Sequence, residues 1–149
     1  MDVSVRHSAA DRLLHPFIFL SRLGLGWYLM STGWAKLAGD LNSGLGTFYG
    51  GGSFQNRSAW MPEFVAVLFG YSWPWLETAF GLLVLVGLWG RMSAAVSAWI
   101  LLSIGLALLF VGEFFPRHHI MVFFPMALML WLLGPGRYSV DGWLSTRRS

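Results

Sequence analysis

Residues 64–90 read FVAVLFGYSWPWLETAFGLLVLVGLWG, an apolar run that a single charge, Glu77, interrupts. A helix needs about 20 apolar residues to cross the roughly 30 Å hydrocarbon core of a bilayer, and this run is longer than that. Pro74 marks a kink or a helix start between two tryptophans. The run therefore predicts a membrane-spanning helix that holds one carboxylate.

Three other stretches have the same character, and the last of them ends at a strong helix stop, Gly134-Pro135-Gly136. The expected fold is an all-α integral membrane four-helix bundle, formed by one domain over residues 1–149. One long Gly-rich non-cytoplasmic loop is expected to separate the first two spans and to fold back onto the membrane surface. The spans are expected at approximately 14–38, 62–90, 92–113 and 118–135, and the loop at 39–61.

The composition agrees with a membrane protein, since 56% of the residues are hydrophobic and 11% are charged, against roughly 25% charged in soluble domains. The absence of cysteine excludes disulfides, thiol nucleophiles and thiolate metal sites. The ten Lys and Arg residues are spread singly along the chain, which excludes a nucleic-acid patch. The lipid bilayer is therefore the first expected partner.

The basic residues also predict an orientation. With four spans, Arg6, Arg12, Arg91, Arg137, Arg147 and Arg148 fall on one side, whereas Lys36, Arg57 and Arg117 fall on the other. Because cytoplasmic segments are enriched in Lys and Arg, both termini are expected in the cytoplasm of a bacterial inner membrane.

Arg22 and Glu77 are the charges expected deepest in the membrane, at similar depth, where pairing would offset much of the cost of burying each. One helical stripe of the first span contains Arg22, Gly26, Leu29, Gly33 and Lys36, and one of the second contains Glu77, Gly81, Val84, Leu88 and Arg91. Glycines on both stripes permit close approach, so the two stripes are expected to face one another.

The two facing stripes allow more than one interpretation, and their charged candidate residues are Arg22, Lys36, Glu77 and Arg91. It can be a structural ion pair with snorkelling end charges. It can instead line a polar pocket for a small amphipathic ligand, such as a quinone head group, or carry a proton route through Glu77.

Secondary candidates lie near the fourth span. His118 and His119 are candidates for a metal or proton relay, but adjacent histidines point about 100° apart on a helix, so no metal site is expected. His15 is expected on the opposite membrane face, which excludes a bis-histidine haem pocket. Arg137 and Asp141 are expected to pair beside a short segment that Ser139 starts.

Three patterns resemble the DoxX family of membrane proteins: Arg22 with Gly33 and Lys36, Glu77 to Arg91 as E-x3-G-x9-R, and GPGRYSVD at 134–141. The resemblance implies a four-helix membrane bundle whose relatives occur with thiosulfate:quinone oxidoreduction and with oxidative-stress enzyme complexes.

The leading expected function is that of a small membrane subunit or anchor of a redox complex. Its candidate ligand is a quinone, its expected partner is a membrane or peripheral redox protein, and no covalently bound cofactor is expected. Catalysis by the chain alone is not expected, because it has no cofactor motif, haem pair or thiol. The alternatives are a carrier or permease-like module for a small solute or lipid, and a structural assembly factor. A homo-oligomer is compatible with each.

Overall fold

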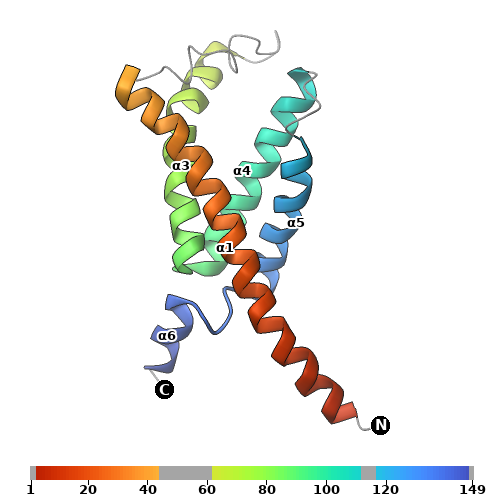
Figure 1. Ribbon diagram of the computed structural model, residues 1–149. Coiled ribbons are helices and arrows are strands. Elements are labelled where there is room, and N and C mark those ends of the chain that lie inside the picture. The colour runs from red at the N-terminus through yellow and green to blue at the C-terminus, as the bar shows by residue number, and fades with distance from the viewer. Residues whose placement is uncertain (1–2, 44–61, 112–116, 148–149) are drawn as a thin grey trace.

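The computed structural model describes residues 3–43, 62–111 and 117–147, and these residues are helical apart from turns. The helices are α1 (Val3–Ser43), α3 (Glu63–Val86), α4 (Gly90–Val111), α5 (Arg117–Leu133) and α6 (Val140–Thr146), shown in Figure 1. The predicted all-α class is confirmed. The greater part of the predicted 39–61 loop, residues 44–61, lies outside the described residues.

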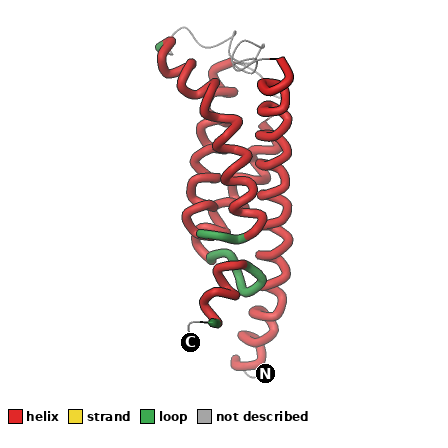
Figure 2. The backbone as a smooth tube through the Cα atoms, turned by 90° about the vertical axis from the view of Figure 1, so that its left-hand side faces the viewer, coloured by secondary structure: helices red, strands yellow, loops and turns green. Residues whose placement is uncertain are grey.

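The long helices lie side by side in an elongated bundle (Figure 2). α1 packs along α3, α4 packs against α5, and α3 also contacts α4. The start of α1 and the end of α6 lie at the same end of the molecule (Figure 1), and we call this the terminal end. The molecule therefore has a terminal end and an opposite end, where α1 finishes and α5 begins.

α1 is longer than the predicted span, because it starts at Val3 rather than near residue 14 and continues to Ser43. Pro16, expected in the first turn, lies inside the helix. A proline removes one backbone hydrogen bond but does not have to end a helix that packing supports. Hydropathy located the apolar part of this helix and missed its polar extension.

The turn between α3 and α4 also differs from the prediction. α3 ends at Val86, because Gly87 adopts a left-handed conformation with φ 76° and donates to the carbonyls of Leu83 and Val84. Trp89 also has a positive φ of 49°, and α4 begins at Gly90. The predicted span continued to residue 90 and missed this stop, which depends on the left-handed conformation that glycine adopts without strain.

The C-terminal stop follows the prediction. α5 ends at Leu133, and Gly134 and Gly136 have φ values of 87° and 75°. The Ser139 hydroxyl accepts a hydrogen bond of 3.0 Å from the backbone N–H of Gly142, which caps the start of α6. The expected short segment started by Ser139 is therefore confirmed.

Glycines bring α1 and α3 into direct backbone contact. A Cβ atom added to Gly26 would lie 2.6 Å from the backbone nitrogen of Leu85, and one added to Gly33 would lie 2.5 Å from that of Thr78. Gly81 has the same close contact with Met30. The two predicted stripes therefore face each other over these residues, as expected.

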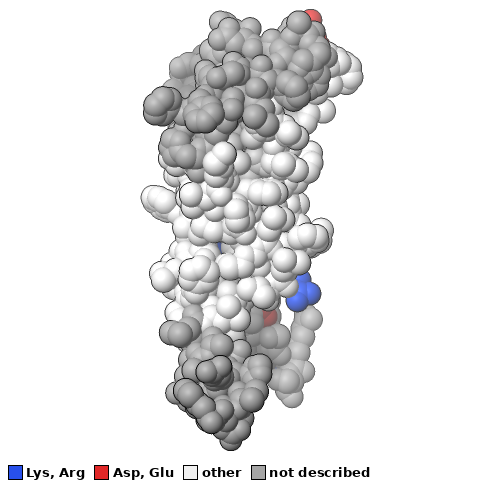
Figure 3. All heavy atoms as spheres, turned by 90° about the vertical axis from the view of Figure 1, so that its right-hand side faces the viewer, with Lys and Arg blue, Asp and Glu red and all other residues white. Residues whose placement is uncertain are grey.

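The outer surface exposes many large apolar side chains, among them Trp27, Trp34, Leu68, Trp75 and Leu102. Figure 3 shows one face on which few charged atoms are visible between the grey ends. Across the described ranges, no helix combines the length and the apolar character needed to cross a membrane. The four predicted spans are therefore not confirmed.

Candidate functional site

The buried carboxylate of Glu77 pairs with Lys36. The Lys36 ammonium donates to both carboxylate oxygens at 2.7 Å. The side chain of Glu77 is 1% exposed and that of Lys36 is 26% exposed, so the carboxylate is enclosed and the Lys36 side chain is only partly buried. The predicted pairing of Glu77 with Arg22 is wrong.

The position of the α3 stop explains this correction. Arg22 lies beside Gly87, since a Cβ on that glycine would overlap the Arg22 guanidinium. Glu77 is ten residues earlier in α3, about 15 Å away along the helix at 1.5 Å per residue. Because α1 and α3 run in opposite directions, Glu77 lies opposite the later turns of α1, where Gly33 and Lys36 occur.

Gly33 allows the pair to form. A Cβ on this residue would lie 2.7 Å from the Cβ of Glu77, so only glycine lets α1 approach α3 this closely. The Thr32 hydroxyl also lies within hydrogen-bonding reach of the Glu77 carboxylate. It donates at 2.9 Å to the backbone carbonyl of Tyr28, one turn earlier. A single hydroxyl proton serves only one of these acceptors at a time.

Four polar side chains follow one another along α1 at intervals of four residues, and we call them the α1 polar row: Tyr28, Thr32, Lys36 and Asp40. Residues four apart are neighbours on a helix surface, so each is next to the following one. Asp40, near the end of α1, is 3% exposed. Of this row, the sequence pointed only to Lys36, although the four-residue spacing is visible in the sequence.

The row also contacts α5. The ring of Tyr28 stacks on Phe123 with centroids 4.2 Å apart and on His119 with centroids 6.0 Å apart. Tyr28 also interacts electrostatically with Glu77. The secondary candidate His119 is exposed, and its stack on Tyr28 connects it to the Lys36–Glu77 region. The side chain of His118 lies outside the described residues.

Arg22 forms a separate centre at the terminal end. Its guanidinium donates to the carbonyls of Tyr138 at 2.6 Å and Pro135 at 3.2 Å, and it lies 5.4 Å from the ring centroid of Phe19. Arg22 is 4% exposed and, among the described residues, has no carboxylate partner. Its charge is offset by backbone carbonyl dipoles, so it attaches the segment after α5 to α1.

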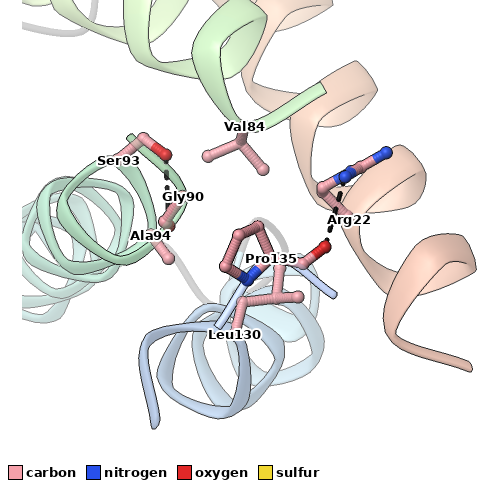
Figure 4. A pocket seen from close by; sticks show the side chains of 7 residues that line it. All are labelled: Arg22, Val84, Gly90, Ser93, Ala94, Leu130 and Pro135. Carbon is pink, nitrogen blue, oxygen red and sulfur yellow. Dashed lines mark hydrogen bonds between the residues drawn. The ribbon is translucent and has the colours of Figure 1, made fainter. Parts of the chain in front are cut away.

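A narrow crevice lies beside Arg22, and Figure 4 shows the guanidinium reaching across it to Pro135. The space among the lining side chains is too small to admit a water molecule. These side chains belong to Arg22, Val84, Gly90, Ser93, Ala94, Leu130 and Pro135. The described structure is therefore closed at this point.

Asp141 does not pair with Arg137 as predicted. Its carboxylate accepts from the backbone N–H groups of Trp89 at 3.1 Å and Gly90 at 2.7 Å, at the start of α4. These N–H groups have no partner within the helix, and a carboxylate there also interacts favourably with the helix dipole. Arg137 is exposed. Capping α4 satisfies two backbone donors at once, which an exposed ion pair with Arg137 would not do.

Arg91 is also misplaced by the prediction. It lies in the first turn of α4 and is exposed, so it does not belong to the α3 stripe with Glu77. The structure thus brings Lys36 and Glu77 together and places Arg22, Arg91 and Asp141 near the terminal end. Within the described part of the chain, no three His, Asp or Glu side chains gather as metal ligands.

Comparison with known proteins identifies one family. The family model described as DoxX matches residues 17–111, which include Arg22, Lys36, Glu77 and Arg91. The match confirms the resemblance, although it ends before the GPGRYSVD segment. No curated protein and no solved structure matches the chain.

Proposed function

Because the chain belongs to the DoxX family, a family of membrane proteins, we propose that it is a small integral membrane subunit or anchor of a redox complex. The proposed ligand is a quinone that meets the chain at Lys36 and Glu77. The proposed location is the bacterial inner membrane with both termini in the cytoplasm, supported by the excess of basic residues at the terminal end.

The exterior of the bundle supports the membrane location. Large apolar side chains such as Leu68, Trp75 and Leu102 are between 45% and 64% exposed, on helices that carry few charges. Lipid would cover these apolar side chains, whose exposure to water costs free energy.

The observation that carries the proposal is the Lys36–Glu77 pair. A buried ion pair often stabilises a fold no better than apolar side chains of the same size would. Ionisable groups inside a membrane protein commonly mark a ligand or ion site. Glu77 is enclosed while the side chain of Lys36 is 26% exposed, so Lys36 is the member of the pair that is partly accessible from outside the bundle.

Quinone chemistry matches this arrangement. A quinone carbonyl accepts a hydrogen bond, which the Lys36 ammonium supplies, whereas a quinol hydroxyl donates one, which the Glu77 carboxylate accepts. Tyr28 of α1 and Phe123 of α5 stack with ring centroids 4.2 Å apart beside this region, and aromatic side chains favour contact with a flat ring. Electrons come from a partner protein, because the sequence has no cofactor motif or thiol of its own.

The test is purification of the tagged chain from native membranes in mild detergent. Mass spectrometry then identifies the proteins that copurify and measures the extracted quinone per chain. We compare the native chain with Glu77→Gln and with Ser97→Ala, a control that removes a buried hydroxyl from α4.

The proposal expects a stoichiometric redox protein and quinone with the native chain and with Ser97→Ala. Glu77→Gln should retain the partner and lose the quinone. A lone protein without quinone contradicts the proposal. Loss of chain abundance in Glu77→Gln, with no quinone on the native chain, would assign the pair to a structural assembly factor instead.

A further inference from the structure

The segment after α5 is fastened to the start of α4 at the terminal end. Pro135 packs directly against Gly90, since a Cβ on that glycine would overlap the proline ring. The Asp141 carboxylate caps α4, and the Asp141 N–H donates to the carbonyl of Gly87 at 3.2 Å. Figure 1 shows α6 at this end, below the ends of α3 and α4. Residues from α4, from the segment after α5 and from α6 therefore share one surface.

Two exposed arginines lie near each other on this surface. A Cβ added to Gly134 would lie 3.6 Å from the Nε atom of Arg91, so the Arg91 side chain reaches the stop of α5. Arg137 follows that glycine by three residues, which span at most about 11 Å of extended chain. Both arginines are exposed, and neither forms an ion pair with a described carboxylate. We call Arg91 and Arg137 the arginine pair.

The charge of the arginine pair is not balanced nearby. Asp141 is the only acidic side chain that the structure describes at the terminal end, and both of its oxygens already accept from backbone N–H groups. Arg147, just after α6, is a third exposed arginine, with its guanidinium 3.8 Å from the ring centroid of Trp143. A guanidinium stacked on an indole keeps its N–H edges available to an anion. The surface therefore carries an excess of positive charge.

Large apolar side chains are exposed at the helix ends nearest to the arginine pair. Met92 follows Arg91 in α4, and Leu132 and Leu133 form the last turn of α5. The exposed surface thus changes from apolar to basic within a few residues on both helices. A ligand that suits both parts has a negative group joined to an apolar body, and an anionic phospholipid has this chemistry.

The conformation of Trp89 points to the same environment. Its φ of 49° lies in the left-handed region, which costs free energy for a bulky residue. Its side chain is 69% exposed, so packing within the chain offsets little of this cost. Tyr138 and Trp143 are exposed at the same end. Tryptophan and tyrosine concentrate at the level of lipid headgroups, where their rings find both apolar and polar contacts.

We propose that the arginine pair binds the headgroup of an anionic phospholipid at the terminal end. The lipid phosphate accepts N–H groups from Arg91 and Arg137, while the acyl chains cover the apolar side chains beside them. The site rests on the membrane location proposed above. It lies away from Lys36 and Glu77 and needs neither quinone nor a redox partner.

The test is native mass spectrometry of the purified full chain in mild detergent. The chain is titrated with phosphatidylglycerol or with phosphatidylcholine of the same acyl chains, and the dissociation constant of the first bound lipid is measured. No quinone or partner protein is present, so failure of this experiment is distinct from failure of the proposed function.

The variants are Arg91→Gln and Arg137→Gln, whose side chains are exposed, so the fold should be kept. The matched control is Arg117→Gln, which removes the same charge from the first residue of α5 at the opposite end. Arg91→Lys keeps the charge and loses the planar guanidinium. Circular dichroism checks that each variant retains its helices.

The native chain should bind phosphatidylglycerol at least about tenfold more tightly than phosphatidylcholine. Arg91→Gln and Arg137→Gln should each weaken phosphatidylglycerol binding by about fivefold and leave phosphatidylcholine binding unchanged. Arg91→Lys should lose less than Arg91→Gln. Arg117→Gln should change the affinity by less than about twofold, because its charge lies more than a Debye length away.

Equal affinity of the native chain for the two lipids overturns the proposal, and so does a loss in Arg117→Gln as large as that in Arg91→Gln. Displacement of phosphatidylglycerol by millimolar ammonium phosphate would assign the arginine pair to a soluble anion instead. If the glutamine variants fail to fold, the salt dependence of the native chain decides. Raising ammonium acetate from about 0.1 M to about 1 M must reduce the preference for phosphatidylglycerol, and an unchanged preference overturns the proposal.

Discussion

Removing one member of the Lys36–Glu77 pair should destabilise the chain by an amount that depends on which member remains. At an effective dielectric constant of about 20, unit charges 2.7 Å apart attract by about 6 kcal/mol before the cost of removing both from water. Desolvation offsets most of this attraction, so the net value of the pair is small. Breaking it by removing one partner costs about 3 to 5 kcal/mol when the other stays buried.

The exposures of the two side chains predict an asymmetry. Lys36→Met leaves the carboxylate of Glu77, which is 1% exposed, without its ammonium, so we expect the full cost of about 3 to 5 kcal/mol. Glu77→Gln leaves Lys36, whose long side chain is 26% exposed and can turn its ammonium toward polar surroundings, so we expect a smaller loss of about 2 kcal/mol. The double variant Lys36→Met/Glu77→Gln should lie within about 1 kcal/mol of the native chain.

The assay is reversible unfolding of the purified chain in mixed micelles of mild detergent and SDS, followed by circular dichroism. The four chains form a double-mutant cycle, which isolates the coupling between the two side chains. A larger loss for Glu77→Gln than for Lys36→Met, or a double variant as unstable as the sum of the single variants, would show that the two side chains are not coupled in this way. Ser97→Ala serves as the control for a buried change away from the pair.

Five other variants test the packing and the terminal end, four of them in the same unfolding assay and one by limited proteolysis. Gly33→Ala and Gly81→Ala should each destabilise the chain by about 1 to 3 kcal/mol, because the added Cβ overlaps the backbone of the facing helix. Gly39→Ala should instead stabilise the chain by up to about 1 kcal/mol, because nothing lies within 4 Å of the added Cβ. Asp141→Ala should cost about 1 kcal/mol through loss of the α4 cap, and an unchanged midpoint would show that water replaces the carboxylate. Arg22→Gln should release the segment after α5, which limited proteolysis would detect as faster cleavage between Leu133 and Val140, and equal cleavage rates would contradict the role of Arg22 as its attachment.

The candidate site was only partly predictable. The sequence identified Lys36 and Glu77 as residues of facing stripes, because the glycine spacing on both helices required close approach. It did not identify their pairing, since the depth of each charge was counted from span ends that moved by several residues. Gly87 stops α3 before residue 90, and this places Arg22 opposite the turn rather than opposite Glu77.

The helical class, the stop at Gly134-Pro135-Gly136, the start of α6 after Ser139 and the contact between the two stripes were all predictable from the sequence alone. These properties depend on local backbone preferences and on the periodicity of apolar and small residues. The packing of the helices was needed to show which charges meet and that Asp141 caps α4 instead of pairing with Arg137. The reason is that partners far apart in the chain depend on the register of packed helices, which shifts by 1.5 Å for every residue by which a helix end moves.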